Sequence, residues 1–422
     1  MEVGRPVCSP ARWAVTWCAL AAGFGVGCGA EDATPPSQVS APCPTLGDAC
    51  AAPAGTPPAV GERTTIVPSP LMPPGVVSQT AHNNLDIVWH DGRLFFAFRT
   101  APSHFASELV TLYVVSTTDQ EAWRFEGSFQ LGKDLREPRL LSVGGRLFLY
   151  FAVLSEIPLT FVPERTVVSE WLGPERWTPV EDIFEPGFIP WRARTLDGVG
   201  HVIGYVGGES IYENEQGGVR VHWLTTTDGR AFAPYVSGQP VILEGGSSET
   251  DLAFLDDGGI VAVSRNEAGD ELGWGSKICR APAGALGQWE CVADPKKYDS
   301  PVVFRNGADV YLIARRQVAN DGKYDLGDRD KPASELSIDF QKEYWTTPKR
   351  CSLWKVDPAD LSVSFVLDLP SSGDTCFASV VPLGSGRHLV YNYTSDPSKP
   401  DTPWLEGQGG PTEIYSLTLS LP

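Results

Sequence analysis

The chain has 422 residues, of which 42% are hydrophobic and 20% are charged, and its formal net charge is −19. This composition is ordinary for a globular protein, and the length is compatible with several cores or with one repeat fold. The acidic balance argues against nucleic acid or an anionic membrane face as the partner, because both bind basic surfaces.

The first 28 residues have the features of an export signal. Arg5 and Arg12 precede an apolar run, residues 13–26, which is too short to remain as a membrane span. The run ends in Gly27-Cys28 and resembles a bacterial lipoprotein signal, which implies that Cys28 carries lipid. Simple secretion, with cleavage near Ala30, is the alternative. We therefore predict an exported protein, either a lipoprotein of the outer membrane or cell surface or a secreted one.

Residues 29–63 are rich in Ala, Pro, Thr and Ser, and they cannot bury enough apolar surface to offset the entropy of ordering. We expect a disordered tether there and a folded domain over residues 64–422.

The nine cysteines fit an oxidising compartment. Cys8 and Cys18 belong to the signal, and Cys28 is the lipidation candidate. The remaining six lie in sequence-order pairs and are predicted disulfide partners, namely Cys43 with Cys50, Cys279 with Cys291, and Cys351 with Cys376. A zinc site is the weaker interpretation, because there is no Cys-x-x-Cys and there are only six histidines.

From residue 76 onward, short apolar runs alternate with Gly-rich turns, and one hairpin pattern recurs. Six copies are found, at residues 85–99, 137–150, 191–205, 249–265, 299–315 and 377–391. Repeats of four short strands at this period are typical of β-propeller blades. We predict an all-β, six-bladed propeller, with five blades as the alternative. Thr64–Val67 is expected to pair with residues 414–419 and close the ring.

Two turns share a hydroxyl residue, an Asp two positions later and an aromatic residue four positions beyond it. They are residues 117–123 and 226–232, at the expected turns between third and fourth strands. Asp119 and Asp228 are expected to cap backbone N–H groups, which is a structural role. An insertion at about residues 317–345 is dense in charge and is either a rim loop over one mouth of the propeller or a solvated excursion.

These features resemble the sialidase superfamily. The two turns look like degenerate Asp-boxes, and the hairpin from Glu249 to Arg265 is similar to the sialidase segment with the catalytic glutamate and the second arginine of the substrate-carboxylate triad. Arg99 and Arg315 end the equivalent strands of the first and fifth blades. The resemblance implies a glycosidase with Glu249 in catalysis and the three arginines in substrate binding.

Two positions depart from that pattern. The tyrosine nucleophile of sialidases would fall at Phe377, whereas Tyr391 and Tyr393 lie one strand later. The loop where an acid/base aspartate would lie, residues 103–108, offers His104 and Glu108 instead. His104 is expected to support this loop.

Repeat-equivalent positions form a ring at one mouth of a propeller, and this ring carries acids and arginines. Its predicted members are Asp86, Glu137, Arg192, Glu249, Asp299 and Asp374, with Arg99, Tyr205, Arg265, Arg315 and Tyr391 nearby. We assign Glu249, Asp86, Glu137 and Asp374 as catalytic candidates, because glycoside hydrolysis needs a carboxylate pair. The arginines, with Tyr205 and Tyr391, are candidates for holding a polyhydroxylated or anionic sugar. The alternative is that these charges are structural ion pairs between blades.

The sequence thus predicts an exported, monomeric glycoside hydrolase of sialidase-like type that acts on a terminal, possibly acidic, sugar. A carboxylate-pair furanosidase and a non-catalytic glycan-binding lipoprotein are the alternatives. No cofactor or metal is expected, since the chain has no HExxH, phosphate-binding glycine loop or Gly-x-Ser-x-Gly motif. Any membrane contact would be through the lipid anchor.

Overall fold

The computed structural model describes residues 57–211 and 218–422. The predicted signal peptide, the lipidation candidate Cys28, the pair Cys43 and Cys50, and most of the predicted tether lie outside the described residues. No helix in the described part has the length and apolar character needed to cross a membrane.

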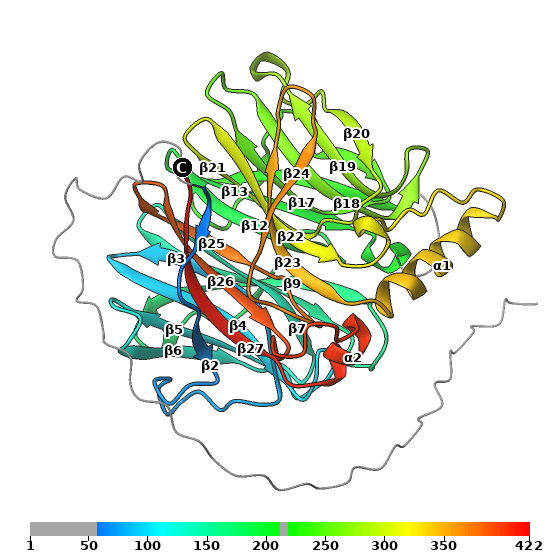
Figure 1. The fold of residues 1–422 in the computed structure, drawn as a ribbon. Coiled ribbons are helices and arrows are strands. Elements are labelled where there is room, and N and C mark those ends of the chain that lie inside the picture. The colour runs from blue at the N-terminus through cyan, green and yellow to red at the C-terminus, as the bar shows by residue number, and fades with distance from the viewer. Residues whose placement is uncertain (1–56, 212–217) are drawn as a thin grey trace, which may run out of the picture. The chain divides into compact units, whose positions relative to one another are not determined.

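Six antiparallel sheets follow one another along the chain, and each is a propeller blade (Figure 1). Blade I contains β3 (Ala81–His90), β4 (Arg93–Ala101), β5 (Thr111–Thr117) and β6 (Trp123–Phe129). Blade II contains β7 (Asp134–Val143), β8 (Arg146–Leu154), β9 (Pro163–Gly173), β10 (Arg176–Trp177) and β11 (Glu181–Ile183). Blade III contains β12 (Ile189–Leu196), β13 (Val199–Val206), β14 (Val219–Thr226), β15 (Ala233–Pro234) and β16 (Val241–Gly245).

The second half repeats the pattern. Blade IV contains β17 (Ser247–Phe254), β18 (Ile260–Asp270), β19 (Gly273–Ala281) and β20 (Glu290–Asp294). Blade V contains β21 (Asp299–Asn306), β22 (Asp309–Gln317), β23 (Lys349–Val356) and β24 (Val363–Asp368). Blade VI contains β25 (Ser379–Gly384), β26 (Arg387–Thr394) and β27 (Glu413–Ser420), completed by β1 (Ala59–Val60) and β2 (Thr64–Val67). The prediction of six blades is confirmed.

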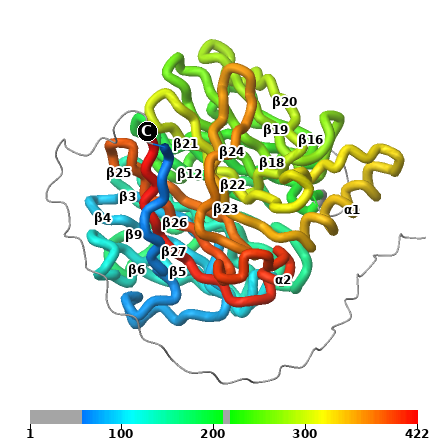
Figure 2. The backbone as a smooth tube through the Cα atoms, viewed as in Figure 1, coloured from blue at the N-terminus to red at the C-terminus, as the bar shows by residue number. Residues whose placement is uncertain are grey.

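The ring closes through strands from both ends of the domain. β2 pairs antiparallel with β27, so Thr64 lies opposite Ser416, as the sequence predicts. β1 also pairs with β27, which means that pairing begins at Ala59, inside the segment expected to be tether. In Figure 2 the blue N-terminal strand runs beside the red C-terminal one. The outer strands of blade VI therefore come from the opposite end of the chain, which removes a free sheet edge.

Buried carboxylates tie the first strand of one blade to the first strand of the next. Asp86 accepts a hydrogen bond from the backbone N–H of Leu140 at 2.8 Å and one from the Ser379 hydroxyl at 2.7 Å. Asp251 accepts from the backbone N–H of Val303 at 2.7 Å. The contacts of Asp86 join blade I to blades II and VI, and that of Asp251 joins blade IV to blade V. We call Asp86 and Asp251 the clasp acids.

The Asp-box-like turns are structural in the way the sequence predicts. Asp119 Oδ1 accepts from the backbone N–H groups of Glu121 and Ala122, at 2.9 and 2.8 Å. Asp228 Oδ1 does the same with Arg230 and Ala231, at 2.9 and 2.8 Å. Each carboxylate thus satisfies N–H groups that the tight turn would leave unpaired.

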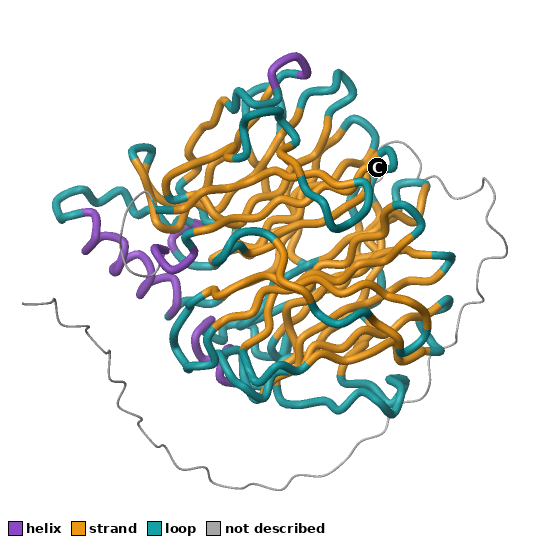
Figure 3. The backbone as a smooth tube through the Cα atoms, turned by 180° about the vertical axis from the view of Figure 1, so that it is seen from behind, coloured by secondary structure: helices purple, strands orange, loops and turns teal. Residues whose placement is uncertain are grey.

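The inserted segment of blade V contains a helix rather than irregular chain. α1 (Ala333–Trp345) begins after Pro332, and its apolar side chains Leu336, Phe340 and Tyr344 pack with Tyr324 and Trp274. A short second helix, α2 (Trp404–Gly409), contacts α1. The helical segments stand out in Figure 3 against the strands, and the remaining ones are single 3₁₀ turns at Gly208–Ile211, Ala283–Ala285 and Asn320–Gly322.

Two of the three predicted disulfides lie within the described residues, and both are formed. Cys279–Cys291 joins β19 to β20, where the two residues face each other across the strands. Cys351–Cys376 joins β23 of blade V to the segment that precedes β25 of blade VI. The second bridge therefore holds the chain immediately after Asp374 in place.

Candidate functional site

A cluster of charged and aromatic side chains lies at the end of the propeller where first strands begin and second strands end. We call it the axial cluster. Its members are Arg99, His104, Asp134, Arg136, Glu137, Glu249, Arg265, Glu267, Lys297, Asp299, Arg315, Tyr344, Asp374 and Tyr393. Hydrogen bonds and ion pairs connect most of these side chains across blades.

Glu249 and Arg265 form the blade IV part of the cluster. Arg265 NH1 lies 3.0 Å from Glu249 Oε1 and 3.2 Å from Glu267 Oε2. Glu249 Oε2 accepts a hydrogen bond of 2.7 Å from the backbone N–H of Ser300. Lys297 donates to Glu267 at 2.5 Å. Glu249 and Arg265, which the sequence places in one hairpin, therefore form an ion pair, and a second carboxylate, Glu267, shares the arginine.

Arg315 and Asp299 form the blade V part, and α1 and α2 cover it. Arg315 NH1 donates to Asp299 Oδ2 at 2.9 Å, and its Nε donates to the Thr375 carbonyl at 2.6 Å. Tyr344, near the end of α1, donates its hydroxyl to Asp299 Oδ2 at 2.7 Å. The Arg315 guanidinium lies 5.0 Å from the ring centroid of Trp404 in α2. The insertion thus contributes side chains to the cluster.

Arg99 is fully buried, and both of its terminal nitrogens donate to protein acceptors, whereas its Nε has no hydrogen-bond partner. It donates to Asp134 Oδ1 at 2.8 Å, to Asn83 at 3.2 Å, and to the carbonyls of Ser103 and Phe105. Arg99 therefore holds the loop between β4 and β5 in this structure.

His104, in that loop, faces Asp374 from the segment before β25. His104 Nδ1 lies 2.6 Å from Asp374 Oδ2, and the Tyr393 hydroxyl donates to Asp374 Oδ1 at 2.7 Å. The main chain of His104 is fixed on both sides, because its N–H donates to Gln408 of α2 and its carbonyl accepts from Arg136.

Glu137 lies at a bulge in β7, above an aromatic floor. Its Oε2 is buried without a hydrogen bond and lies 3.6 Å from the Arg139 guanidinium. Arg139 lies over the rings of Trp191 and Phe377, at 5.1 and 4.6 Å from the ring centroids. The floor of the cluster is thus a cation that lies over two aromatic rings in edge contact with each other, and Phe377 is one of them.

Glu137 has a φ of 53°, in the left-handed region. Ser300, at the equivalent bulge of blade V, has a φ of 54°. Because the two bulges share this conformation, we attribute it to the repeat rather than to strain specific to Glu137.

The carboxyl groups divide into two electrostatic classes. Burial raises the pKa of Glu137 to about 7, despite the opposing charge of Arg139, and Glu249 raises it further. Burial also raises the pKa of Glu249 against the effect of Arg265. Burial alone would raise the pKa of Asp299 and Asp374, but cationic and hydroxyl neighbours outweigh it and hold both pKa values below normal. The cluster therefore contains carboxyls that favour the protonated form beside carboxylates that stay ionised.

Four predicted site residues lie outside the axial cluster. Asp86 is a clasp acid. Arg192 donates to the carbonyls of Ser300, Pro301 and Ala378, so it bridges blades III, V and VI. Tyr391 donates to Gln120 of the blade I turn at 3.1 Å. Tyr205 is buried in the core of blade III.

Sequence reasoning named Tyr393 only as a tyrosine one strand after Phe377, and it missed five members of the cluster: Asp134, Arg136, Glu267, Lys297 and Tyr344. Asp134 and Arg136 belong to a charged run at the start of β7, and that run was a usable signal. Lys297 precedes Asp299 by two residues and has the same kind of signal. Tyr344 had none, because its place depends on the fold of the insertion.

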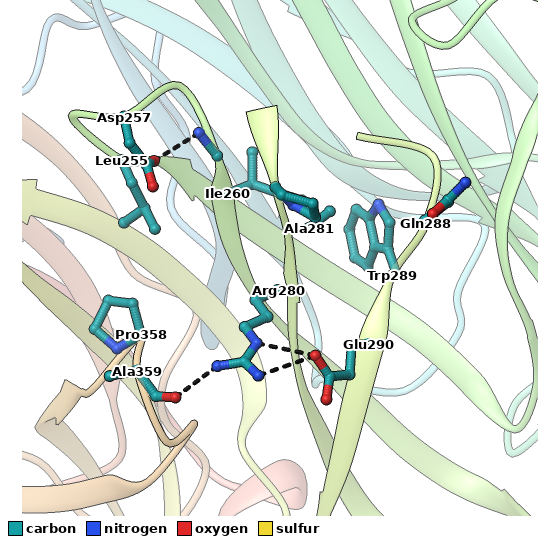
Figure 4. A pocket seen from close by; sticks show the side chains of 12 residues that line it. Leu255, Asp257, Ile260, Arg280, Ala281, Gln288, Trp289, Glu290, Pro358 and Ala359 are labelled. Carbon is teal, nitrogen blue, oxygen red and sulfur yellow. Dashed lines mark hydrogen bonds and ion pairs between the residues drawn. The ribbon is translucent and has the colours of Figure 1, made fainter. Parts of the chain in front are cut away.

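Two cavities are lined by residues away from the axial cluster. The larger, about 840 Å³, lies at the opposite end of blades IV and V, beside Trp289, Pro358 and the turn before Ile260 (Figure 4). There Arg280 donates to Glu290 and to the Ala359 carbonyl, so its guanidinium is already paired. In residues 57–211 and 218–422 no group of three or more His, Cys, Asp or Glu side chains is placed to hold a metal ion.

Comparison with known proteins bears on the fold. No protein-family model and no curated protein matches the sequence. The structure is similar to a Dyadobacter fermentans protein of unknown function, with a TM-score of 0.55 and 15% identity over 82% of this chain and 97% of that one. It is also similar to Trypanosoma rangeli sialidase in complex with sialic acid, with a TM-score of 0.52 and 11% identity. That match covers 80% of this chain and 54% of the sialidase, so the chain spans about half the length of the sialidase. This protein has a sialidase-like six-bladed β-propeller fold.

Proposed function

We propose that the protein is an extracytoplasmic glycoside hydrolase that acts on a terminal sugar at the axial cluster. The observation that carries the proposal is the pair Glu137 and Glu249. Both carboxyls are buried, each comes from the first strand of its own blade, and both have a raised pKa. Glycoside hydrolysis requires a carboxylic acid that is still protonated near neutral pH, together with a second charged group.

The two glutamates are suited to different tasks. Glu137 has a buried oxygen without a hydrogen bond, so no protein acceptor takes the proton that the proposal assigns to the leaving oxygen. Glu249 is held by Arg265 and by the Ser300 N–H, which fixes its orientation. A fixed carboxylate beside the sugar ring would stabilise the positive charge that develops at the anomeric carbon. We assign Glu137 as the general acid and Glu249 as the electrostatic partner.

An acidic sugar is the substrate class that the arginines favour. Arg265 and Arg315 lie next to Glu249 and Asp299, and each now donates to protein carboxylates. A sugar carboxylate would exchange with one of these acceptors and keep the charge balance of the site. Guanidinium groups bind carboxylates in paired hydrogen bonds, which gives such a substrate its orientation.

A non-catalytic glycan receptor is the second candidate. The observation that favours it is Phe377, which occupies the floor beneath Arg139 and offers no nucleophile. In this alternative the cluster binds a sugar without cleaving it.

The proposed location outside the cytoplasm rests on the N-terminal sequence and agrees with the two disulfides. Whether Cys28 carries lipid is tested by metabolic labelling with a fatty-acid analogue, comparing the wild type with Cys28→Ser. The protein is proposed to act as a monomer, which light scattering of the purified domain checks.

The test of function is turnover on a glycan panel with the chain from Ala59 onward, so that both closing strands are kept. The panel contains sialosides, uronic-acid glycans and arabinans, with Glu249→Gln assayed beside the wild type. Turnover that is lost in the variant supports the hydrolase. Binding without turnover, unchanged in the variant, would retire the hydrolase and leave the receptor.

A further inference from the structure

His104 and Asp374 form a buried dyad that the proposed carboxylate pair does not use. The loop of blade I supplies the imidazole, and the segment before blade VI supplies the carboxylate. The two are joined at 2.6 Å, and the carboxylate is fully buried. Tyr393 and the Ser395 hydroxyl also bind Asp374, so its position is fixed independently of His104.

The partners of Asp374 determine which imidazole nitrogen carries the proton. The Tyr393 hydroxyl donates to one oxygen of Asp374, and the carboxylate is held in its ionised form, as its lowered pKa indicates. The other oxygen therefore accepts from Nδ1–H of His104, which leaves the lone pair on Nε2. No hydrogen bond from residues 57–211 or 218–422 reaches Nε2, and 12% of the side chain is exposed. An acceptor nitrogen is thus held open at the cluster.

The charges around the imidazole favour its neutral form. Burial lowers the pKa of His104, Asp374 opposes this effect, and Arg136 and Arg99 lower the pKa further. Tyr393 also faces the dyad, with ring centroids 6.2 Å apart, and stays neutral because its pKa is raised well above normal. These are the titratable and charged groups that face His104, and they come from β4, β7, β26 and the segment before β25.

We propose that His104 is the general base of this site and that Asp374 is the residue that positions it. The proposal rests on the proposed glycosidase function and adds the group that activates water. A hydrogen bond to its main chain positions His104 near Glu137. Arg136, the residue before Glu137, donates this bond to the His104 carbonyl at 2.8 Å. The loop with the base and the strand with the acid are therefore locked to each other.

The step balances without a cofactor. His104 Nε2 takes a proton from water as the water oxygen bonds to the anomeric carbon. The glycosidic C–O bond breaks, and Glu137 gives its proton to the leaving oxygen. The products are a free sugar, the leaving group as an alcohol, an imidazolium and a carboxylate. Solvent returns the proton from His104 to Glu137 before the next turnover.

The test measures kcat and KM against pH for the wild type, His104→Gln and Asp374→Asn, using the glycoside that the panel identifies and its 4-nitrophenyl analogue. A general base contributes about 100- to 10,000-fold, so we expect His104→Gln to lose that factor in kcat with little change in KM. His388→Gln is the matched control, because His388 lies on blade VI beside Phe304, outside the cluster. It should keep the wild-type rate.

The pH profile separates a base from a structural histidine. The wild type should lose kcat/KM as pH falls through the pKa of His104, which lies below its ordinary value. This fall of kcat/KM at low pH should disappear in His104→Gln. In Asp374→Asn it should move to lower pH, because the Asp374 carboxylate raises the pKa of His104. The 4-nitrophenyl leaving group departs without protonation. The activated substrate should therefore restore the turnover of Glu137→Gln, which lacks the general acid, but not that of His104→Gln, which lacks the general base.

The outcomes distinguish the two proposals. A wild type that cleaves no glycoside overturns both. A wild type that does cleave, with His104→Gln keeping its kcat and its fall of kcat/KM at low pH, overturns the role of His104 and leaves the glycosidase. A further readout needs no substrate, since ¹⁵N spectra of the imidazole should show Nδ1–H at neutral pH. Protonation at Nε2 instead would contradict the proposal.

Discussion

The clasp acids and Glu137 of the axial cluster occupy similar places in their repeats but have different hydrogen-bond partners. Asp86 and Asp251 each give an oxygen to a backbone N–H of the next blade. Glu137 keeps an oxygen without a hydrogen bond. Burial raises the pKa of both Glu137 and Asp86, so the difference between them lies in the hydrogen bonds. A carboxylate that completes a neighbouring backbone stabilises the ring, whereas one that lacks such a partner costs stability and is available for chemistry.

The difference shows why the functional role of each acid in such a ring cannot be assigned from the repeat pattern of the sequence. Every first strand brings its side chains to the axis, so position alone does not assign a role. What separates Glu137 from the clasp acids is that its Oε2 meets the Arg139 guanidinium and no N–H group of the next blade. Glu249 combines both kinds of contact, since it accepts from the Ser300 N–H and pairs with Arg265. The predictions below test this division.

The largest expected effect is on stability at a clasp acid. Asp251→Asn removes the charge that balances Arg194, with which Asp251 forms an ion pair, and weakens the bond to Val303. Breaking one partner of a buried pair costs about 3–5 kcal/mol. We expect the free energy of unfolding to fall by that amount in urea titrations. A change smaller than that of an exposed control, Asp256→Asn, would contradict the clasp.

The second effect is the pH dependence of stability from Glu137. Its pKa of about 7 in the folded chain is raised above the ordinary value of 4.5, so the folded state keeps a proton that the unfolded state releases. The stability that this group contributes is complete below pH 4.5 and is lost as pH rises to about 7. The loss corresponds to about 3 kcal/mol.

Glu137→Gln should therefore become more stable relative to the wild type over that range. Urea titrations of both proteins between pH 4.5 and 7.5 measure the difference. Asp251→Asn, at a clasp acid that pairs with Arg194, is the comparison and should be less stable than the wild type at pH 7. A constant difference between Glu137→Gln and the wild type would show that Glu137 is ionised in the folded protein.

The smallest effect belongs to the Asp-box-like turns, which carry acids that are neither clasps nor cluster members. Asp119→Ala removes the acceptor of two backbone N–H groups in an exposed turn. The loss of unfolding free energy should be small, like that of an exposed capping side chain. Thermal unfolding checks this, and turnover should be unchanged. A loss as large as that of Asp251→Asn would put this turn in the same class as the clasps.

The repeat architecture could be predicted because each blade contains the same hairpin pattern. Tight turns between runs of alternating apolar residues specify that hairpin locally. The closing strand and the Cys279–Cys291 disulfide were predictable for the same reason, since each involves regular strand pairing. The Cys351–Cys376 disulfide was predicted only from the order of the cysteines in the sequence. The cluster was only half predictable. Glu249 and Arg265 share one hairpin, so their meeting is local. Tyr344 reaches Asp299 only after the insertion folds into α1, and His104 reaches Asp374 only when blades I and VI close the ring.

The pH–rate profile of Glu137→Gln beside Asp86→Asn tests the central claim most directly. The general acid must be protonated, so wild-type kcat/KM should fall as pH rises through about 7, the pKa of Glu137. Glu137→Gln should lose most turnover of the glycoside that the panel identifies. Folded Asp86→Asn should keep both the wild-type rate and the fall of kcat/KM at high pH. Equal losses of turnover in the two variants would contradict the division between the clasp acids and Glu137.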